Sequence, residues 1–248
     1  MSADTLSRAA RHLALPQVGE QGQQQIGRGT ALLIGVGGIG CPAATYLASS
    51  GIGRLMLCDF DTVDETNLGR QVLYGPGHIG ELKAEVAASR LRKVNPEVDV
   101  VSIPFRLSDS ALADAVNEAD VVLDGCDNFS TRFQVNDACV AARRRLITGS
   151  AIRFEGQLAV FGPDYSESPC YRCLYVEADE SLGNCAGNGV LAPVPGVIGT
   201  IMAAEALKFL AGVDTAAPVL RLYDAAATEF RHLAIRKRID CPACSKNA

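Results

Sequence analysis

The chain has 248 residues, of which 48% are hydrophobic and 21% charged, an ordinary composition for one large globular α/β domain. Its formal net charge of −5 gives no general attraction to nucleic acid or to anionic membranes. Trp is absent and aromatic residues make up 6%, so we expect no surface on which nucleic-acid bases stack.

Two stretches of the chain bear on its compartment and on membrane insertion. Residues 1–17 lack the continuous apolar core of a signal peptide. Residues 194–213 are strongly apolar but contain Pro195, Glu205 and Lys208, which predicts a buried helix rather than a membrane span. Nine cysteines without an export signal indicate a reducing cytoplasm, where thiols serve as metal ligands or nucleophiles.

Apolar runs alternate with helical patterns through the first 150 residues. Strands are expected at residues 30–34, 54–58, 98–103, 121–124 and 146–148. Helices are expected at residues 41–50, 82–94, 111–117 and 129–143. This alternation predicts an α/β fold with a Rossmann-like, mostly parallel sheet and helices on both faces.

The pattern changes after residue 149. Residues 152–161 are interrupted by Glu155 and Gly156, which predicts an antiparallel hairpin broken at that point. Residues 165–192 are polar and Gly-rich, and a structureless segment of that length is usually functional or disordered. The last expected elements are a helix at residues 196–211 and a closing hairpin of strands at residues 219–223 and 228–235.

A glycine-rich loop, GVGGIG at residues 35–40, follows the first expected strand. Gly35, Gly37 and Gly40 have the spacing that lets the backbone approach a phosphate and lets the next helix pack closely. Asp59 ends the second strand, where an acidic residue can accept hydrogen bonds from a ribose. The alternative is an ordinary turn between a strand and a helix, with a solvated aspartate. The combination of the first strand, the glycine-rich loop, the following helix and Asp59 favours a nucleotide site.

The class of nucleotide depends on the residues that follow. None of the three histidines stands in a catalytic context, as a dehydrogenase would require. Arg70 on a loop and Lys83 at the start of a helix can instead grip a triphosphate. On these two residues alone, a solvated charged loop explains the pattern equally well.

The fourth expected strand ends in DGCDN at residues 124–128. Ligands bind at the carboxyl ends of strands in such sheets, so Asp127 can hold a magnesium ion between phosphates. The simpler interpretation is that Asp127 or Asn128 caps the helix that begins near residue 129. The two roles do not exclude each other.

Two C-x-x-C motifs lie far apart in the chain, at Cys170 and Cys173 and at Cys241 and Cys244. Four thiolates in two close pairs suit one tetrahedral zinc ion. A site with four protein ligands is closed and therefore structural. The alternative is two unrelated pairs, redox-active or unpaired.

The motifs occur in a recognisable order: GVGGIG, DFDTV with TNLGRQ, CDN, PCYRCL and CPAC. As an ordered set they resemble the bacterial relatives of ubiquitin-activating enzymes, the molybdopterin-synthase adenylyltransferase (MoeB) and thiamine-pathway adenylyltransferase (ThiF) family. The resemblance runs from Arg8 to Cys244. It implies one adenylation domain over residues 1–248, with an N-terminal arm at 1–28, a nucleotide-binding half at 29–150 and a carrier-binding, zinc-containing half at 151–248.

The resemblance also assigns a nucleotide site. Its implied residues are Gly35, Gly37, Gly38, Gly40, Asp59, Thr66, Asn67, Leu68, Gly69, Arg70, Lys83, Asp127 and Asn128. Within this set, Asp127 matches the magnesium-associated aspartate, and Arg70, Lys83 and Asp127 are the implied catalytic groups.

Two further residues have implied roles. Arg11 matches an arginine that reaches the triphosphate of a partner subunit, which implies a homodimer, although Ala9 and His12 depart from the family's usual pattern there. Cys185 matches a cysteine that in some members links covalently to the carrier protein or its sulfur. Its Gly- and Asn-rich surroundings predict an exposed loop, and an unreactive loop cysteine remains the alternative.

By this resemblance the chain uses ATP and Mg²⁺ to adenylylate the C-terminal Gly-Gly carboxylate of a ubiquitin-fold sulfur carrier, releasing pyrophosphate. A separate sulfur donor, such as a cysteine desulfurase or a rhodanese, is expected to follow. Two other classes stay open, an NAD-dependent oxidoreductase and a non-catalytic carrier-binding scaffold. A related enzyme that cyclises a modified tRNA base also has this nucleotide-binding fold. The paired C-x-x-C motifs and the negative net charge of this chain disfavour that function here.

The sequence does not decide which biosynthetic pathway the sulfur carrier belongs to. Residues 152–157 look slightly more like the molybdopterin branch, and residues 40–44 look slightly more like the thiamine branch. A specialised sulfur-metabolite pathway is a third possibility.

Overall fold

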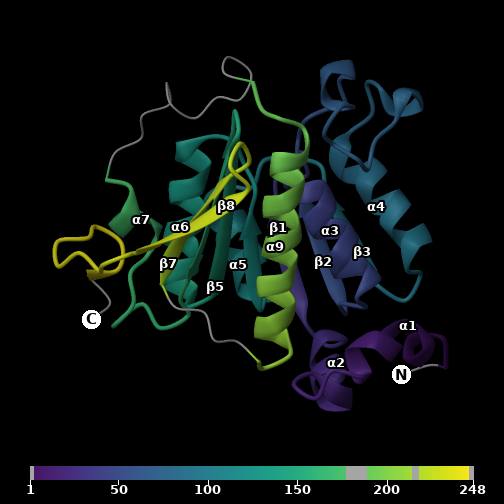
Figure 1. Ribbon diagram of the computed structural model, residues 1–248, viewed down its shortest axis with the longest axis horizontal. Helices are drawn as coiled ribbons and strands as arrows, with labels where there is room; N and C mark the ends of the chain where they lie inside the picture. The colour runs from purple at the N-terminus through teal and green to yellow at the C-terminus, as the bar shows by residue number, and fades with distance from the viewer. Residues whose placement is uncertain (1–2, 177–188, 214–217, 246–248) are drawn as a thin grey trace.

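An eight-stranded mixed sheet forms the centre of the computed structural model, which describes residues 3–176, 189–213 and 218–245 (Figure 1). The strands are β1 (Thr30–Ile34), β2 (Arg54–Cys58), β3 (Asp99–Ile103), β4 (Val121–Asp124), β5 (Arg145–Ile152), β6 (Glu155–Phe161), β7 (Val219–Asp224) and β8 (Glu229–Ala234). Their order is β3-β2-β1-β4-β5-β6-β7-β8, parallel from β3 to β5 and antiparallel from β5 to β8. The predicted Rossmann-like sheet with antiparallel C-terminal strands is therefore confirmed.

Helices cover both faces of this sheet. They are α1 (Ala3–Leu13), α2 (Gly19–Ile26), α3 (Gly40–Ser49), α4 (Lys83–Val94), α5 (Asp109–Glu118), α6 (Phe129–Ala142), α7 (Tyr171–Leu174) and α9 (Pro193–Leu210), with 3₁₀ turns η1 (Glu65–Asn67) and η2 (Pro76–His78). Alternate strand residues serve two cores: Leu33 packs with α3, α4 and α9, whereas Leu32 packs with α5 and α6. Burial on both faces explains why the parallel strands read as unbroken apolar runs.

Helix α9 is the most apolar helix of the fold. Within the described residues it is the one helix long and apolar enough to cross a membrane, judged by length and composition. Its buried residues, among them Ile198, Met202 and Ala206, join the core that α3 and the sheet share. In this structure α9 is a core helix. It begins at Pro193 rather than at residue 196 because Pro195 lies in its first turn, where the missing N–H has no partner to lose.

The hairpin between β5 and β6 turns earlier than the sequence indicated. Ile152 pairs with Glu155, so the turn consists of Arg153 and Phe154, and Arg153 takes a left-handed φ of +52°. Gly156, which we expected to break the strand, lies inside β6. A Cβ there would approach Ile198 of α9 to 2.6 Å, so this glycine admits a close helix rather than making a turn.

The N-terminal segment folds into the two helices α1 and α2. Ala9 of α1 and Ile26 of α2 are buried against the fold. Arg8 Nη1 donates a hydrogen bond of 2.9 Å to the carbonyl oxygen of Val94, at the end of α4. His12 Nδ1 lies 2.9 Å from Gln23 Oε1, which joins α1 to α2. This pair of helices lies beyond the amino ends of the parallel strands (Figure 1).

The polar segment at residues 165–192 is not structureless in its described part. It contains the short helix α7, which begins directly after Cys170. Near its end, the backbone N–H of Leu191 donates to the carbonyl oxygen of Arg153 at 2.8 Å. Cys185 lies outside the described residues, so its expected exposure stays a prediction.

Candidate active site and metal centre

A pocket opens at the carboxyl ends of β1 and β4, where the strand order reverses and ligands of open α/β sheets bind. Gly35 follows β1 with φ +84°, and a Cβ on it would lie 3.0 Å from backbone atoms of Gly125, which follows β4. A Cβ on Gly40 would lie 2.0 Å from the carbonyl oxygen of Gly35. Glycine is therefore required at both positions, and α3 begins directly behind the loop with its N-terminus available to an anion.

Asp59 braces the glycine loop from the end of β2. Its Oδ2 accepts the backbone N–H of Val36 at 2.7 Å, and its Oδ1 accepts the N–H of Asp61 at 2.9 Å. Burial raises the pKa of Asp59 above its ordinary value, while Lys83 and these two N–H groups act in the opposite direction. Each carboxylate oxygen keeps a second lone pair, so Asp59 can still accept a hydrogen bond from a ribose.

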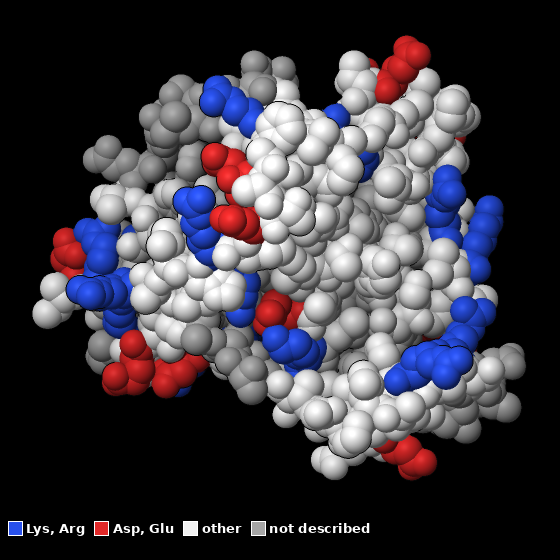
Figure 2. All heavy atoms as spheres, viewed as in Figure 1, with Lys and Arg blue, Asp and Glu red and all other residues white. Residues whose placement is uncertain are grey.

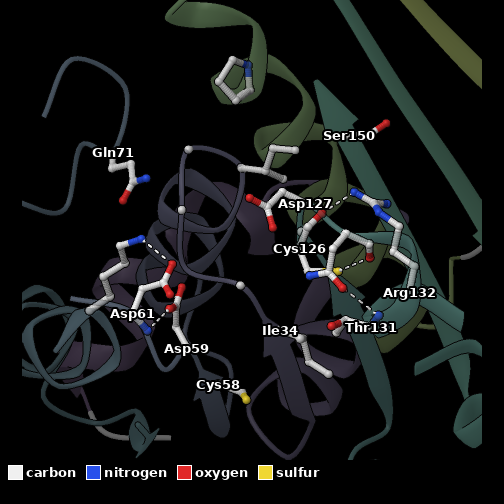
Figure 3. A pocket seen from close by; sticks show the side chains of 18 of the residues that line it. Ile34, Cys58, Asp59, Asp61, Gln71, Cys126, Asp127, Thr131, Arg132 and Ser150 are labelled. Carbon is white, nitrogen blue, oxygen red and sulfur yellow. Dashed lines mark hydrogen bonds and ion pairs between the residues drawn. The ribbon is translucent and has the colours of Figure 1, made fainter. Parts of the chain in front are cut away.

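Lys83 stands beside this acidic wall. It is buried, and its Nζ lies 3.0 Å from Oδ2 of Asp61, both side chains lining the pocket (Figure 3). Arg70 lines the same wall half-buried, and its Nη1 donates to the carbonyl oxygen of Thr66 at 3.0 Å. The pocket thus combines two cations with the glycine loop, a combination suited to a polyphosphate.

Asp127 and Arg132 form the opposite wall. The Asp127 carboxylate is exposed and points into the pocket, whereas Arg132 is buried behind it (Figure 3). Arg132 donates to the carbonyl oxygens of Cys126 and Gly149 and to Oγ1 of Thr148. Its guanidinium therefore holds the peptide just before Asp127 against β5.

Asn128 is the residue that caps α6. Its Oδ1 accepts the backbone N–H of Thr131 at 2.9 Å, so the capping role belongs to Asn128. The Asp127 carboxylate stays directed at the pocket. One oxygen ligand of this kind, completed by phosphate oxygens and water, is the usual donor set for Mg²⁺ in nucleotide sites, so the residues fit that ion.

The structure brings together some of the residues that the sequence assigned to this site. Those that line the pocket are Gly35, Gly37, Gly38, Asp59, Arg70, Lys83, Asp127 and Asn128. Those that do not line it are Arg11, Gly40, Thr66, Asn67, Leu68 and Gly69. Asn67 takes part in a capping box with Asp64 at η1, directly before Arg70. This turn positions the arginine without forming the pocket wall itself.

Several residues that line the pocket were not predicted from the sequence. Arg106 follows β3 and lies over the ring of Phe60, with its guanidinium carbon 4.5 Å from the ring centroid. Gln71 and Arg132 also line the pocket and are buried. Asp61 carried a signal, because it stands two residues after Asp59. The other residues lie on elements whose approach to the pocket no local pattern reveals.

The two C-x-x-C motifs meet in one buried cluster. The Sγ atoms of Cys170, Cys173, Cys241 and Cys244 all lie within 4.8 Å of one another. The Sγ–Sγ distances are 3.6 Å between Cys170 and Cys241 and 3.5 Å between Cys173 and Cys244. Four sulfurs at about 2.3 Å from a tetrahedral zinc lie about 3.8 Å apart, so this donor set fits Zn²⁺ and is too widely spaced for disulfides.

The surrounding backbone supports the cluster. The N–H of Arg238 donates to Sγ of Cys173 at 3.4 Å, and Lys237 Nζ donates to the carbonyl oxygens of Ser166 and Cys244. The hydrogen bond from Cys170 lowers the pKa of Cys173 below its ordinary value. The cluster ties the C-terminal residues to the segment that carries α7.

We predict that the purified protein contains about one zinc per chain, the stoichiometry of a four-cysteine site. Cys173→Ser and Cys244→Ser should each lower the zinc content to well under half of that and lower the melting temperature as well, because the site contributes folding free energy. The measurements are elemental analysis and thermal unfolding. Cys139→Ala, which alters a buried cysteine outside the cluster, should keep its zinc. Full metal content in both serine variants would reject the site.

In a comparison with protein-family models, residues 9–243 match the ThiF family. Among curated proteins, the sulfur carrier protein ThiS adenylyltransferase of Escherichia coli is 45% identical over 96% of this chain and 94% of its own length. The sulfur carrier protein adenylyltransferase of Thermus thermophilus is 41% identical over 97% of this chain and 91% of its own. The mouse adenylyltransferase and sulfurtransferase MOCS3 is 44% identical, and the chain spans 54% of its length.

Solved structures give a consistent result. The crystal structure of E. coli MccB with succinimide superimposes with a TM-score of 0.83 and 25% identity, covering 98% of this chain and 74% of that one. MccB with ATP gives a TM-score of 0.78 and 26% identity, covering 91% and 69%. The fold of the chain is therefore that of a protein crystallised with ATP.

Proposed function

The chain belongs to the ThiF family, and on this premise we propose that it uses ATP to adenylylate the C-terminal Gly-Gly carboxylate of a ubiquitin-fold sulfur carrier protein, releasing pyrophosphate. The observation that carries the proposal is the pocket in which Arg70, Lys83 and Asp127 surround a glycine loop and a helix N-terminus. Relatives named as sulfur carrier protein adenylyltransferases match nearly the whole chain, which supports the same reaction here. The chain spans about half the length of the mouse and pig MOCS3 relatives, 54% in each case.

The proposed reaction needs no general base. A C-terminal carboxylate has a pKa of about 3.3–3.7 and is already ionised at neutral pH, ready to attack the α-phosphorus of ATP. Among the described residues that line the pocket none is a histidine, in keeping with this chemistry. The work left to the protein is to align carboxylate and phosphate and to stabilise charge on the departing pyrophosphate.

Each pocket residue then has a role. Lys83 and Arg70 bind phosphate oxygens, the lysine held in place by Asp61 and the arginine by the carbonyl of Thr66. Asp59 binds the ribose while it braces the glycine loop. Asp127 would hold Mg²⁺, which when bound neutralises charge on the phosphates. Arg132 keeps the peptide before Asp127 in register with β5.

We propose that the protein is a homodimer in which Arg11 of each subunit reaches the triphosphate in the nucleotide pocket of the partner subunit. Arg11 is exposed on α1, beyond the amino ends of the strands and away from the pocket of its own chain (Figure 1). Helix α3 carries no charged residue, and the surface over α3 in Figure 2 is largely free of Lys, Arg, Asp and Glu. Such a surface suits contact with a second copy.

We further propose a single adenylation domain over residues 1–248, with nucleotide binding in residues 29–150 and carrier binding in residues 151–248. The four-cysteine cluster would hold a structural Zn²⁺ that fixes the second half. The proposed compartment is the cytoplasm, and the sulfur donor is a separate protein such as a cysteine desulfurase or a rhodanese. The carrier, and with it the molybdopterin, thiamine or specialised pathway, is left to experiment.

The test is ATP–pyrophosphate exchange with a panel of purified sulfur carriers from the same cell. One carrier should support exchange, and removal of its last glycine should abolish it. Hydride transfer with NAD and no exchange would instead establish the oxidoreductase. Carrier binding without exchange by any carrier would establish the non-catalytic scaffold.

Cys185 gives a prediction about the order of steps. Adenylation precedes thiol chemistry, so Cys185→Ala should keep the wild-type rate of pyrophosphate exchange. If the thiol links to the carrier, only that linkage or the later sulfur transfer should fail, which non-reducing electrophoresis and mass spectrometry of the carrier would detect. Loss of exchange in a folded Cys185→Ala protein would contradict this order.

A further inference from the structure

The two helices that begin at the nucleotide pocket both end against the N-terminal helices. Helix α3 begins at Gly40 of the glycine loop and ends at Ser49, and α4 begins at Lys83 and ends at Val94. Helices α1 and α2 lie at the far ends of both (Figure 1). The segment that carries Arg11 is therefore attached to the same two helices whose first residues stand at the pocket.

Gln23 of α2 joins three helices through one buried side chain. It is 1% exposed, and its Nε2 donates a hydrogen bond of 2.9 Å to the carbonyl oxygen of Ser50, the C-cap of α3. Carbonyl groups at a helix C-terminus have no partner within the helix, so Gln23 supplies a donor that α3 itself lacks. The other end of the same amide, Oε1, lies 2.9 Å from Nδ1 of His12 on α1. Because the amide oxygen can only accept, His12 Nδ1 is the donor.

Arg8 provides a second attachment, one helical turn before His12. Its Nη1 donates to the carbonyl oxygen of Val94, the last residue of α4, at 2.9 Å. The ends of α3 and α4 are themselves joined, since Nδ2 of the buried Asn95 donates to the carbonyl oxygen of Ala48 at 2.9 Å. Residues four apart lie on one face of a helix, so α1 is held at two points of one face. Two such points fix the rotation of α1 about its axis.

The rotation of α1 decides where Arg11 points. Successive residues of an α-helix are turned by about 100°, so residues two apart point in nearly opposite directions. Ala9 is buried against the fold, and Arg11, two residues later, is exposed. Arg11 is therefore directed away from the body of its own chain, as an arginine offered to another subunit has to be.

We infer that Gln23 and His12 are positioning residues for Arg11, because they hold α1 in the orientation in which Arg11 reaches the triphosphate of the partner subunit. Neither is among the described residues that line the nucleotide pocket, so an effect on rate has to pass through another group. The inference rests on the proposed role of Arg11 in trans. It adds that this arginine needs a preset direction, since a misplacement of about 1 Å can cost about 100-fold in rate.

The experiment measures carrier-dependent pyrophosphate exchange in variants of this link. Gln23→Leu keeps the size of the side chain and removes both hydrogen bonds, whereas His12→Leu removes only the bond between α1 and α2. We expect each to lower the rate about tenfold or more. His12→Gln retains an N–H donor and should keep most of the rate. The matched control is Gln24→Leu, the same substitution at an exposed position of α2, which should leave the rate unchanged.

Mixing subunits separates the positioning of Arg11 from damage to the pocket of the same chain. In a mixed dimer of Gln23→Leu and Asp127→Ala chains, one pocket is intact and receives Arg11 from a correctly held α1. Activity should therefore return on mixing, as it should for Arg11→Ala. Adding Gln23→Leu to Arg11→Ala should cause little further loss, because both changes act through one group. His12 is half-buried, so His12→Leu gives the same comparisons if Gln23→Leu does not fold.

Three results would overturn the inference. The first is wild-type exchange in both Gln23→Leu and His12→Leu. The second is a loss in Gln24→Leu equal to that in Gln23→Leu. The third is a failure of the Gln23→Leu chains to recover on mixing although Arg11→Ala chains do.

Failure of the proposed function gives different results. If Arg11→Ala itself keeps the wild-type rate, its role in trans is wrong, and the inference falls with it. If no carrier supports exchange, the measurement becomes the Kd of a non-hydrolysable ATP analogue with Mg²⁺. Arg11→Ala and Gln23→Leu should then raise this Kd by the same factor, and a Kd that Gln23→Leu leaves unchanged overturns the inference.

Discussion

Asp127→Ala should reduce carrier-dependent pyrophosphate exchange by about 100-fold or more, the scale expected when one preorganised charge-stabilising group is removed from an active site. Asp127 follows β4, one of the two strands at which the strand order reverses. Its side chain is exposed and points into the pocket (Figure 3). Asn128, not Asp127, caps α6, so helix stability should survive the substitution. The loss should therefore be catalytic, with an unchanged melting temperature.

The chain offers a matched control for Asp127→Ala. Asp114→Ala removes an exposed carboxylate from α5, outside the pocket, and should leave exchange at the wild-type rate. Measuring exchange against Mg²⁺ concentration gives a second readout, because Asp127→Asn should raise the concentration needed for half-maximal rate. If Asp127→Ala keeps the wild-type rate of exchange at limiting Mg²⁺, the assignment of Asp127 to magnesium binding is wrong.

Arg11→Ala should lose most of the exchange activity and still form a dimer. An arginine supplied in trans can contribute about 10³–10⁵ in rate to phosphoryl transfer, or roughly 4–7 kcal/mol of barrier. In its own chain Arg11 is exposed on α1 and is not among the described residues that line the pocket. Any large effect on rate must then act through a second copy. Arg236→Ala, which removes another exposed arginine, should be nearly neutral.

Mixing two inactive variants separates action in trans from a folding defect. In a mixed dimer of Arg11→Ala and Asp127→Ala chains, one site carries both defects and the other carries neither. Activity should therefore return on mixing, toward a quarter of the wild-type level if subunits pair at random. If subunits demonstrably exchange and no activity returns, Arg11 does not act across a subunit interface.

Local signals in the sequence were sufficient to predict much of the fold and part of the pocket. Unbroken apolar runs at residues 30–34 and 121–124 identified buried parallel strands, because both faces of such strands are covered. Gly35 and Gly40 could be assigned from spacing alone, since a turn that brings two backbones within contact distance tolerates no side chain. The two C-x-x-C motifs predicted one cluster for a similar reason, as four thiols rarely gather by chance.

Other features depended on tertiary structure. Gly156 looked like a turn residue, and only the approach of α9 shows that it makes room for Ile198. Thr66 to Gly69 belong to a matching motif but form the turn behind Arg70 rather than the pocket wall. Arg132 and Arg106 reach the pocket from α6 and from the loop after β3, and no short-range pattern specifies which end of a helix or loop meets a distant strand.

The sequence by itself therefore determined most of the strands and helices of residues 29–150, the glycine loop, the cysteine cluster and the family, because each depends on residues close in the chain or on motifs in a fixed order. Tertiary structure decided which charges share a cavity. It joined Lys83 to Asp61, placed Asp127 in the pocket and left Arg11 outside it. It also joined α1 to the far end of α3 through Gln23. Such groupings follow from how helices pack across both faces of the sheet, and packing is a property of the whole fold.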